Sequence, residues 1–356
     1  MQPLRLPPRL GIVLPVRNGA AFLRDALDSL FGQTFADFEL VVVDDGSTDA
    51  TPKILGAFAD PRLRVLANRG AGLVDALSTG LAATAAPLVA RMDADDIALP
   101  SRLERQIAFL DANPGVALVG AQVAHMDAGG RPTGHVSSFP TAPARIAEAL
   151  MTRGCVLRHP TVMARRPALD AVGAYRRVVE GAEDYDLWLR LSERAALANL
   201  PDVLLRYRIH DAQVSHGINW RQRFAHDLAL VAARARRRGE PDPLDGLDAP
   251  LAYRDPAARQ DPRLSPALRS LALAYAAAET MTADADATPD AQALRAMIDT
   301  TRHALFGDGR RTRARMMARA TRAALRGRRW SLALQSARLA FEAAPGRAVG
   351  WMLARG

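Results

Sequence analysis

The chain has 356 residues, of which 49% are hydrophobic and 24% charged, an ordinary balance for a globular protein long enough for two domains. Its one cysteine, Cys155, excludes a disulfide framework within the chain, fits a reducing cytoplasm, and is expected to be buried as a small apolar side chain. The net charge of +9 is uneven, because residues 301–356 carry 13 Arg against two acids. The remainder is slightly acidic, so no nucleic-acid partner is expected, and neither a signal peptide nor a spanning helix is predicted.

Short apolar runs alternate with amphipathic segments over the first 125 residues. This pattern is typical of an α/β domain with a mostly parallel sheet covered by helices. Runs rich in Val, Ile and Leu predict strands at Leu10–Val16, Phe38–Asp44, Leu63–Ala67, Leu88–Asp93 and Val116–Gln122.

Helices are predicted between these strands. Apolar residues at helical spacing predict one over Leu23–Leu30. Ser101 and Glu104 have the spacing of a capping box, which predicts the start of a helix that runs to Ala112.

The second half of the chain changes character. Segments Cys155–Ala164 and Val203–Ile209 are expected to be strands, and Leu187–Leu197 is expected to be a helix. From about residue 220 the chain is rich in Ala and Arg and shows no strand-like alternation. We therefore predict one domain over residues 1–220 and a helical C-terminal region over residues 221–356.

Three of the predicted strands end in segments that carry polar side chains. These segments are Pro15-Val16-Arg17-Asn18, Asp44-Asp45-Gly46-Ser47 and Asp93-Ala94-Asp95-Asp96. In an open α/β sheet, ligands bind beyond the carboxyl ends of the strands, where such groups converge. Carboxylates gathered there can hold a hard divalent cation that neutralises a leaving diphosphate. Each motif alone also occurs as an ordinary turn or helix start, but their combination favours a nucleotide-sugar site.

These segments carry a family resemblance. Residues 15–51, 90–120 and 158–210 resemble glycosyltransferase family 2 of bacterial polysaccharide synthesis, in order and at similar spacing, over Leu10 to Ser215. The resemblance implies a GT-A fold, which is a Rossmann-like, mixed and mostly parallel sheet flanked by helices. It also implies inverting transfer from a UDP-, GDP- or dTDP-sugar to a saccharide or lipid-linked acceptor, in the synthesis of cell-surface polysaccharide or lipopolysaccharide.

The resemblance also assigns roles at the strand ends. The residues implied to bind the nucleotide are Pro15, Val16, Asn18, Asp44, Asp45, Arg69 and Asp93. Asp95, with Asp93 and His210, is implied to hold Mg²⁺ or Mn²⁺, with Asp96 in support.

Catalysis is assigned to a later segment. The Glu183-Asp184 pair matches the family signature in which the aspartate is the catalytic base, with Glu183 or Asp186 as helper. Acids in the first turn of a helix also have a purely structural explanation. The groups implied at the acceptor or the phosphates are His159, Trp188, Arg206 and Arg208.

Other functions were weighed against this one. The segment Arg69–Asp75 begins like a dinucleotide-binding loop but has Asp75 in place of the third glycine, and no basic loop typical of nucleotidyltransferases follows the first strand. A non-catalytic nucleotide-sugar-binding or membrane-docking module remains the main alternative. The helix expected over Arg310–Arg329 would either rest on anionic lipid, placing a cytoplasmic enzyme at the inner face of the membrane, or be a solvated helix that packs on the catalytic domain.

Overall fold

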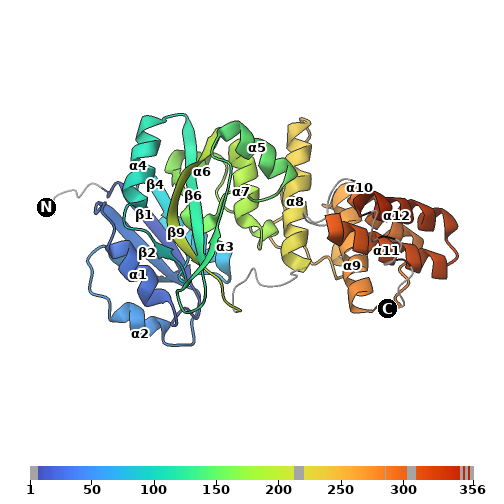
Figure 1. The fold of residues 1–356 in the computed structure, drawn as a ribbon, viewed down its shortest axis with the longest axis horizontal. Coiled ribbons are helices and arrows are strands. Elements are labelled where there is room, and N and C mark those ends of the chain that lie inside the picture. Colours follow the sequence, from blue (N-terminus) through green and yellow to red (C-terminus); the bar gives the residue numbers. More distant parts are fainter. Residues whose placement is uncertain are drawn as a thin grey trace. The chain divides into compact units, whose positions relative to one another are not determined.

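A computed structural model describes residues 7–211, 220–284, 286–302 and 310–344, together with Ala348 and Met352. The chain forms two compact units. The N-terminal unit comprises residues 1–177 and 183–217, and the C-terminal unit comprises residues 178–182 and 218–356. In the described residues, strands occur only in the N-terminal unit, and the C-terminal unit is helical (Figure 1).

One mixed sheet organises the N-terminal unit. Its main path runs in the order β3-β2-β1-β4-β8-β6-β9-β5, and β7 pairs with β6. The strands are β1 (Leu10–Val16), β2 (Phe38–Asp44), β3 (Leu63–Ala67), β4 (Leu88–Arg91), β5 (Ile97–Ala98), β6 (Val116–Met126), β7 (Pro132–Val136), β8 (Met163–Arg165) and β9 (Ala196–Arg208).

The parallel strands place their following loops at one edge of the sheet. β1 is parallel to both β2 and β4, and β2 is parallel to β3. Backbone hydrogen bonds continue past the strand ends: the N–H of Asp45 donates to the carbonyl of Val16 at 2.8 Å, and the N–H of Asn68 donates to that of Asp44 at 2.8 Å. The loops after β1, β2 and β3 therefore lie side by side.

Helices cover this sheet (Figure 1). They are α1 (Leu23–Phe31), α2 (Thr51–Gly56), α3 (Leu73–Ala83), α4 (Arg102–Ala112), α5 (Pro143–Thr152), α6 (Arg166–Ala171) and α7 (Glu183–Ser192), with 3-10 turns at His159–Thr161 and Arg177–Val179. The apolar face of α1 is fully buried, as its spacing predicted. Helix α3 lies so close to β1 that a Cβ on Gly80 would come within 2.4 Å of Val13 Cγ1.

The first three predicted strands are confirmed with their predicted ends. The fourth ends at Arg91, so the acidic segment begins directly after the strand, and β6 continues to Met126. The capping box is wrong, because Ser101 makes no side-chain cap to α4. Glu104 instead accepts a hydrogen bond from the hydroxyl of Thr34 at 2.8 Å.

The predictions in the second half of the unit were less accurate. Only the end of Cys155–Ala164 is extended, because Pro160 lies in a 3-10 turn that precedes β8. The predicted helix at Leu187–Leu197 begins earlier, at Glu183, and ends at Ser192. Cys155 is exposed, which contradicts the expected burial.

The C-terminal unit consists of α8 (Trp220–Arg237), α9 (Pro266–Ala283), α10 (Ala291–Arg302), α11 (Arg310–Arg326) and α12 (Trp330–Ala343), with a 3-10 turn at Ala258–Gln260. A helical region was predicted here, and the described residues confirm it. Its interior includes the fully buried Tyr275, whose hydroxyl donates to Asp227 Oδ2 at 2.6 Å. No helix among the described residues is both long and apolar enough to span a bilayer.

Candidate active site

Three carboxylates gather directly after β4. Ligand atoms of Asp93, Asp95 and Asp96 all lie within 4.8 Å of one another. Asp96 is fully buried, and its Oδ1 accepts the backbone N–H of Arg208 at 2.8 Å. Its Oδ2 is buried with no hydrogen-bond partner in the structure. An unpaired buried carboxylate oxygen beside two further carboxylates fits the oxygen ligands that a hard divalent cation requires.

Mutual repulsion affects the titration of this cluster. Burial raises the pKa of Asp96 well above its ordinary value, and the charges of Asp93 and Asp95 raise it further. Burial likewise raises the pKa of Asp93, with Asp95 and Asp184 contributing, while the ion pair with Arg91 opposes the shift. A bound cation would counteract this repulsion and favour the ionised carboxylates.

The end of β9 supports the acidic loop. His210 Nε2 lies 3.0 Å from Asp95 Oδ2, and its ring packs on Phe22 with centroids 4.9 Å apart. Arg208 is 2% exposed, and its guanidinium donates to the carbonyl of Asp95 and to Asp25 Oδ2. Arg208 was predicted to lie at the acceptor or the phosphates. In the structure its donors hold the acidic loop in place.

The loop after β1 is fixed against the loop after β2. Asn18 has a φ of 52°, a left-handed conformation that Asn tolerates better than most residues. Its backbone N–H donates to the hydroxyl of Ser47 at 2.9 Å, and its Oδ1 accepts the N–H of Thr48 at 2.8 Å. Asn18 thus has its polar groups at the exposed edge of the sheet. Pro15 and Val16 are buried in β1, so their side chains form the floor beneath this edge.

Asp45 connects the second and third loops. Its carboxylate accepts the side-chain amide of Asn68 at 2.6 Å and the backbone N–H of Gly72 at 3.1 Å. Asp44 accepts the N–H of Ser47 at 2.9 Å, so it shapes its own turn. Arg69 is exposed in the loop after β3. The predicted nucleotide-binding groups therefore lie on adjacent loops at one edge.

Helix α7 begins with the predicted base. Asp184 is partly exposed, and its Oδ1 accepts the N–H of Tyr185 at 2.7 Å. Its Oδ2 lies 3.9 Å from the sulfur of Cys155. Glu183 is only 5% exposed. Of this pair, Asp184 is therefore the more exposed acid.

Asp186, suggested as a helper to the base, has a structural role instead. It is fully buried and forms ion pairs with Arg176 and Arg190. Arg190 also donates to the carbonyl of Ala174 at 2.6 Å. Two cations and complete burial keep this carboxylate away from any substrate.

The aromatic residues assigned to the acceptor lie in the core. Trp188 is 1% exposed and His159 is 7% exposed, and their rings meet edge to face at 5.8 Å. His159 Nε2 is 2.8 Å from the hydroxyl of Tyr175, and burial lowers the pKa of His159 well below its ordinary value. The ring of Trp188 thus packs in the core, and its contact with an acceptor stays a prediction. Arg206 by contrast is exposed on β9.

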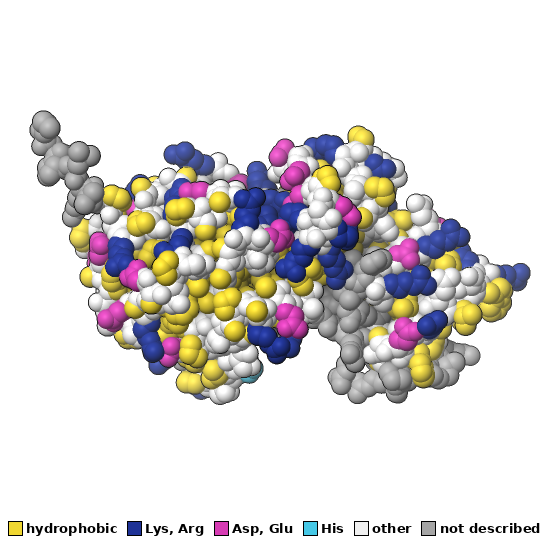
Figure 2. Space-filling view, turned by 90° about the horizontal axis from the view of Figure 1, so that it is seen from above, with side chains coloured by type: hydrophobic (Ala, Val, Ile, Leu, Met, Phe, Trp, Pro, Cys, Tyr) yellow, Lys and Arg dark blue, Asp and Glu magenta, His cyan; other side chains and the backbone are white. Residues whose placement is uncertain are grey.

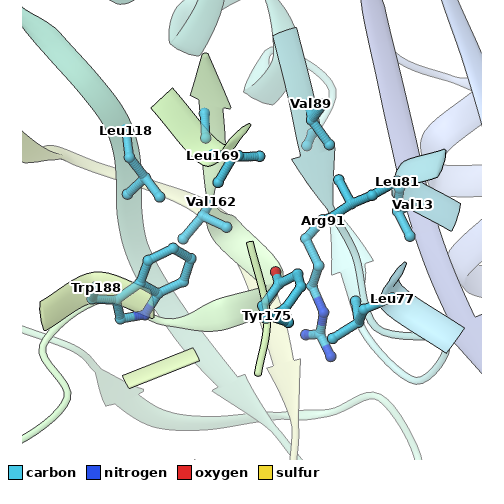
Figure 3. Close-up of a pocket in the computed structure, with 12 residues that line it drawn as sticks. Val13, Leu77, Leu81, Val89, Arg91, Leu118, Val162, Leu169, Tyr175 and Trp188 are labelled. Atoms are coloured by element: carbon cyan, nitrogen blue, oxygen red, sulfur yellow. The ribbon is translucent and has the colours of Figure 1, made fainter. Parts of the chain in front are cut away.

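Tyr175 lies between Trp188 and Arg91 around a small cavity (Figure 3). The cavity measures about 20 Å³, which is room for about one water molecule. A nucleotide sugar cannot enter it, so this cavity is not the ligand site.

Comparison with known proteins agrees with this geometry. The family model described as Glycosyl transferase family 2 matches residues 11–172. The amylovoran biosynthesis glycosyltransferase AmsE of Erwinia amylovora is 33% identical over 202 residues, which are 56% of this chain and 74% of AmsE. The chain belongs to glycosyltransferase family 2. The O-antigen biosynthesis glycosyltransferase WbnJ of Escherichia coli is 29% identical, over 58% of this chain and 82% of WbnJ.

A solved structure shares the fold of this glycosyltransferase. Residues 1–349 of TarS from S. aureus, in complex with UDP-GlcNAc, match with a TM-score of 0.57 and 17% identity over 95% of this chain and 91% of TarS 1–349. The expected GT-A fold, a mixed sheet flanked by helices and followed by a helical region, is confirmed.

Sequence reasoning missed the groups beneath the acids of this glycosyltransferase. Arg91 is 6% exposed and pairs with Asp93, and the fully buried Arg102 donates to the carbonyl of Arg91 at 2.7 Å. Tyr175 holds His159. Arg91 lies two residues before Asp93, at the end of a buried and otherwise apolar strand. A charged residue at the end of an apolar strand is the one sequence signal that could have identified Arg91.

Proposed function

We propose that this glycosyltransferase moves a sugar, with inversion, from a nucleoside diphosphate sugar to an acceptor hydroxyl, and that its catalytic domain is residues 1–220. The observation that carries the proposal is one arrangement of acids. A cation-type cluster at Asp93, Asp95 and Asp96 follows β4, and Asp184 is near enough for its charge to raise the pKa of Asp93. A donor diphosphate and a base for the acceptor require those two elements.

Mg²⁺ or Mn²⁺ would be held by Asp95 and Asp93, with His210 beside Asp95, and would supply charge to the leaving diphosphate. Asp184 takes the proton of the acceptor hydroxyl as that oxygen attacks the anomeric carbon. The new glycosidic bond forms as the bond from carbon to the diphosphate oxygen breaks. Attack opposite the leaving group inverts the configuration, so no covalent sugar–enzyme intermediate is needed.

The nucleotide is proposed to lie along the edge formed by Asn18, Asp44, Asp45 and Arg69. Asp45 can accept hydrogen bonds from a base or ribose, and it is already ordered by Asn68 and Gly72. The exposed Arg69 and Arg206 are the cations suited to phosphate oxygens. Pro15 and Val16 contribute by shaping the strand end that carries Asn18.

The relatives suggest the biological setting. AmsE and WbnJ are named for amylovoran and O-antigen biosynthesis, so we infer a role in cell-surface polysaccharide or lipopolysaccharide synthesis with a saccharide or lipid-linked acceptor. TarS was solved with UDP-GlcNAc, which makes UDP-sugars the first donors to test, followed by GDP- and dTDP-sugars.

The test begins with a thermal-shift panel of UDP-, GDP- and dTDP-sugars, each with Mg²⁺, Mn²⁺ or EDTA. The donor that gives the largest cation-dependent shift is then used to measure hydrolysis or transfer. Asp184→Asn should retain donor binding and lose about 10²- to 10⁴-fold in rate. The matched control is Glu193→Gln, an exposed acid just beyond α7 that should leave the rate unchanged. An unchanged rate in Asp184→Asn would reject the proposed base.

A further inference from the structure

Large apolar side chains lie exposed on one face of α12. Trp330 is 67% exposed, Leu334 is 74% exposed and Phe341 is 52% exposed. Spacings of four and seven residues in a helix bring all three side chains to the same side. We refer to Trp330, Leu334 and Phe341 as the α12 outer face.

The other side of α12 is committed to the helical bundle. Leu332, Ala333 and Ala340 are buried, and the hydroxyl of Thr321 on α11 donates to Ser336 Oγ at 3.0 Å. A surface helix normally has one apolar side, which faces the core, and a polar side, which faces water. Helix α12 departs from this pattern because it is apolar on both sides. Several large apolar side chains exposed on one side of a helix indicate an interaction surface.

Positive charge surrounds this face. Arg326 and Arg328 are exposed at the end of α11 and in the turn before α12. The side chain of Arg338 on α12 is 81% exposed and pairs with Glu342 at 2.7 Å. Residues 301–356 carry 13 Arg against two acids. In Figure 2, hydrophobic and basic side chains lie next to one another over the C-terminal helices. Exposed Trp, Phe and Leu bordered by Arg is the composition of a helix that lies in the interface of an anionic bilayer.

The exposed apolar side chains lie on α12, whereas the sequence favoured α11 for contact with a membrane. On α11, Met316 is 4% exposed and Met317 and Ala318 are fully buried, so these side chains cannot reach lipid. Leu325, near the end of α11, is 42% exposed. These residues pack within the helical unit, where α11 contacts α10 and α12, and the large exposed apolar side chains belong mainly to α12.

We propose that the α12 outer face inserts into the interfacial region of an anionic phospholipid bilayer, with Arg326, Arg328 and Arg338 close to lipid headgroups. The aromatic rings would sit at headgroup depth, where Trp is favoured because its ring is apolar and its N–H is polar. Through this face the glycosyltransferase would bind a membrane surface, whether or not Asp184 is the catalytic base. Charge favours lipid over a second copy of this chain, because the same basic surface would repel itself.

The experiment measures binding of the full chain to vesicles of phosphatidylcholine alone and with 30% phosphatidylglycerol, by co-sedimentation. The wild type should bind the anionic vesicles and weaken as salt is raised. The double variant Leu334→Ser/Phe341→Ser should lose about tenfold or more in partition coefficient. The matched control is the double variant Val65→Ser/Val136→Ser. These two apolar residues are 45% and 50% exposed but lie in the N-terminal unit, so the control variant should bind vesicles like the wild type.

A second measurement reports insertion directly. Brominated lipid should quench the tryptophan emission of the wild type, and Trp330→Phe should abolish most of that quenching while keeping vesicle binding. Equal partitioning of the double variant and the wild type would overturn the proposal. So would a wild type that is dimeric by light scattering and becomes monomeric in the double variant, since a second copy would then cover the face. Activity of Asp184→Asn affects neither readout, so failure here and failure of the proposed base are separate results.

Discussion

Asp184 and Asp186 both lie in the first turn of α7, but the same substitution should affect a different property at each position. Asp186 is fully buried and receives Arg176 Nε at 3.0 Å and Arg190 Nε at 2.8 Å. Asp184 is partly exposed, accepts the backbone N–H of Tyr185 and lies 3.9 Å from the sulfur of Cys155. We therefore predict that Asp186→Asn affects stability, whereas Asp184→Asn affects the reaction.

The magnitude follows from what each substitution leaves behind. Removing one partner of a buried ion pair costs about 3–5 kcal/mol, because the remaining charges stay buried without compensation. Here two guanidinium groups remain, with side chains only 19% and 8% exposed for Arg176 and Arg190, so solvent screens them little. A domain of this size loses about 2–4 °C per kcal/mol, which gives a decrease of roughly 6–20 °C in Tm.

The assay is thermal unfolding followed by near-ultraviolet circular dichroism, together with the rate of donor consumption at a temperature where both variants are folded. Asp184→Asn should remain within about 1 kcal/mol of the wild type, as partly exposed substitutions usually do, and lose the rate. If Asp186→Asn also unfolds within about 1 kcal/mol of the wild type, the ion pairs with Arg176 and Arg190 do not hold the helix start. The structural reasoning would then be wrong.

Three further outcomes are expected. Asp95→Asn should abolish the thermal stabilisation by Mn²⁺ measured with the donor, because an amide is a poorer ligand than a carboxylate. Burial lowers the pKa of His159 in the folded state. Below the ordinary pKa of histidine, the imidazole is therefore protonated in the unfolded chain and neutral in the folded chain. Stability should therefore fall as pH drops below about 6.5, by up to about 1.4 kcal/mol per pH unit, and urea titrations of His159→Gln should show a shallower slope. Gly80→Ala should lower the free energy of unfolding by about 1–3 kcal/mol, since its methyl group would meet Val13, and chemical denaturation measures the change.

The sequence predicts the sheet well where one pattern decides the structure. The strands Leu10–Val16, Phe38–Asp44 and Leu63–Ala67 are continuous apolar runs between turn residues, and their ends are correct. Around Pro160 the apolar residues fit a strand as well as a buried turn, and only packing in three dimensions decides between them. The same limit applies to Ser101, since a capping box requires a side-chain geometry that the spacing alone does not fix.

At the site, the sequence could locate the acids but not divide them by role. Asp93, Asp95, Asp184 and Asp186 look alike in the sequence, because each stands among other acids beside an apolar run. The difference lies in the arginines that reach them from distant segments. Asp186 is neutralised from both sides and becomes part of the core, Asp93 has one buried partner in Arg91, and Asp95 faces a histidine. A carboxylate held between two cations is part of the scaffold, whereas carboxylates gathered beside one another can hold a cation from solution. The partners of each acid, rather than the acid itself, therefore distinguish the scaffold from the candidate site.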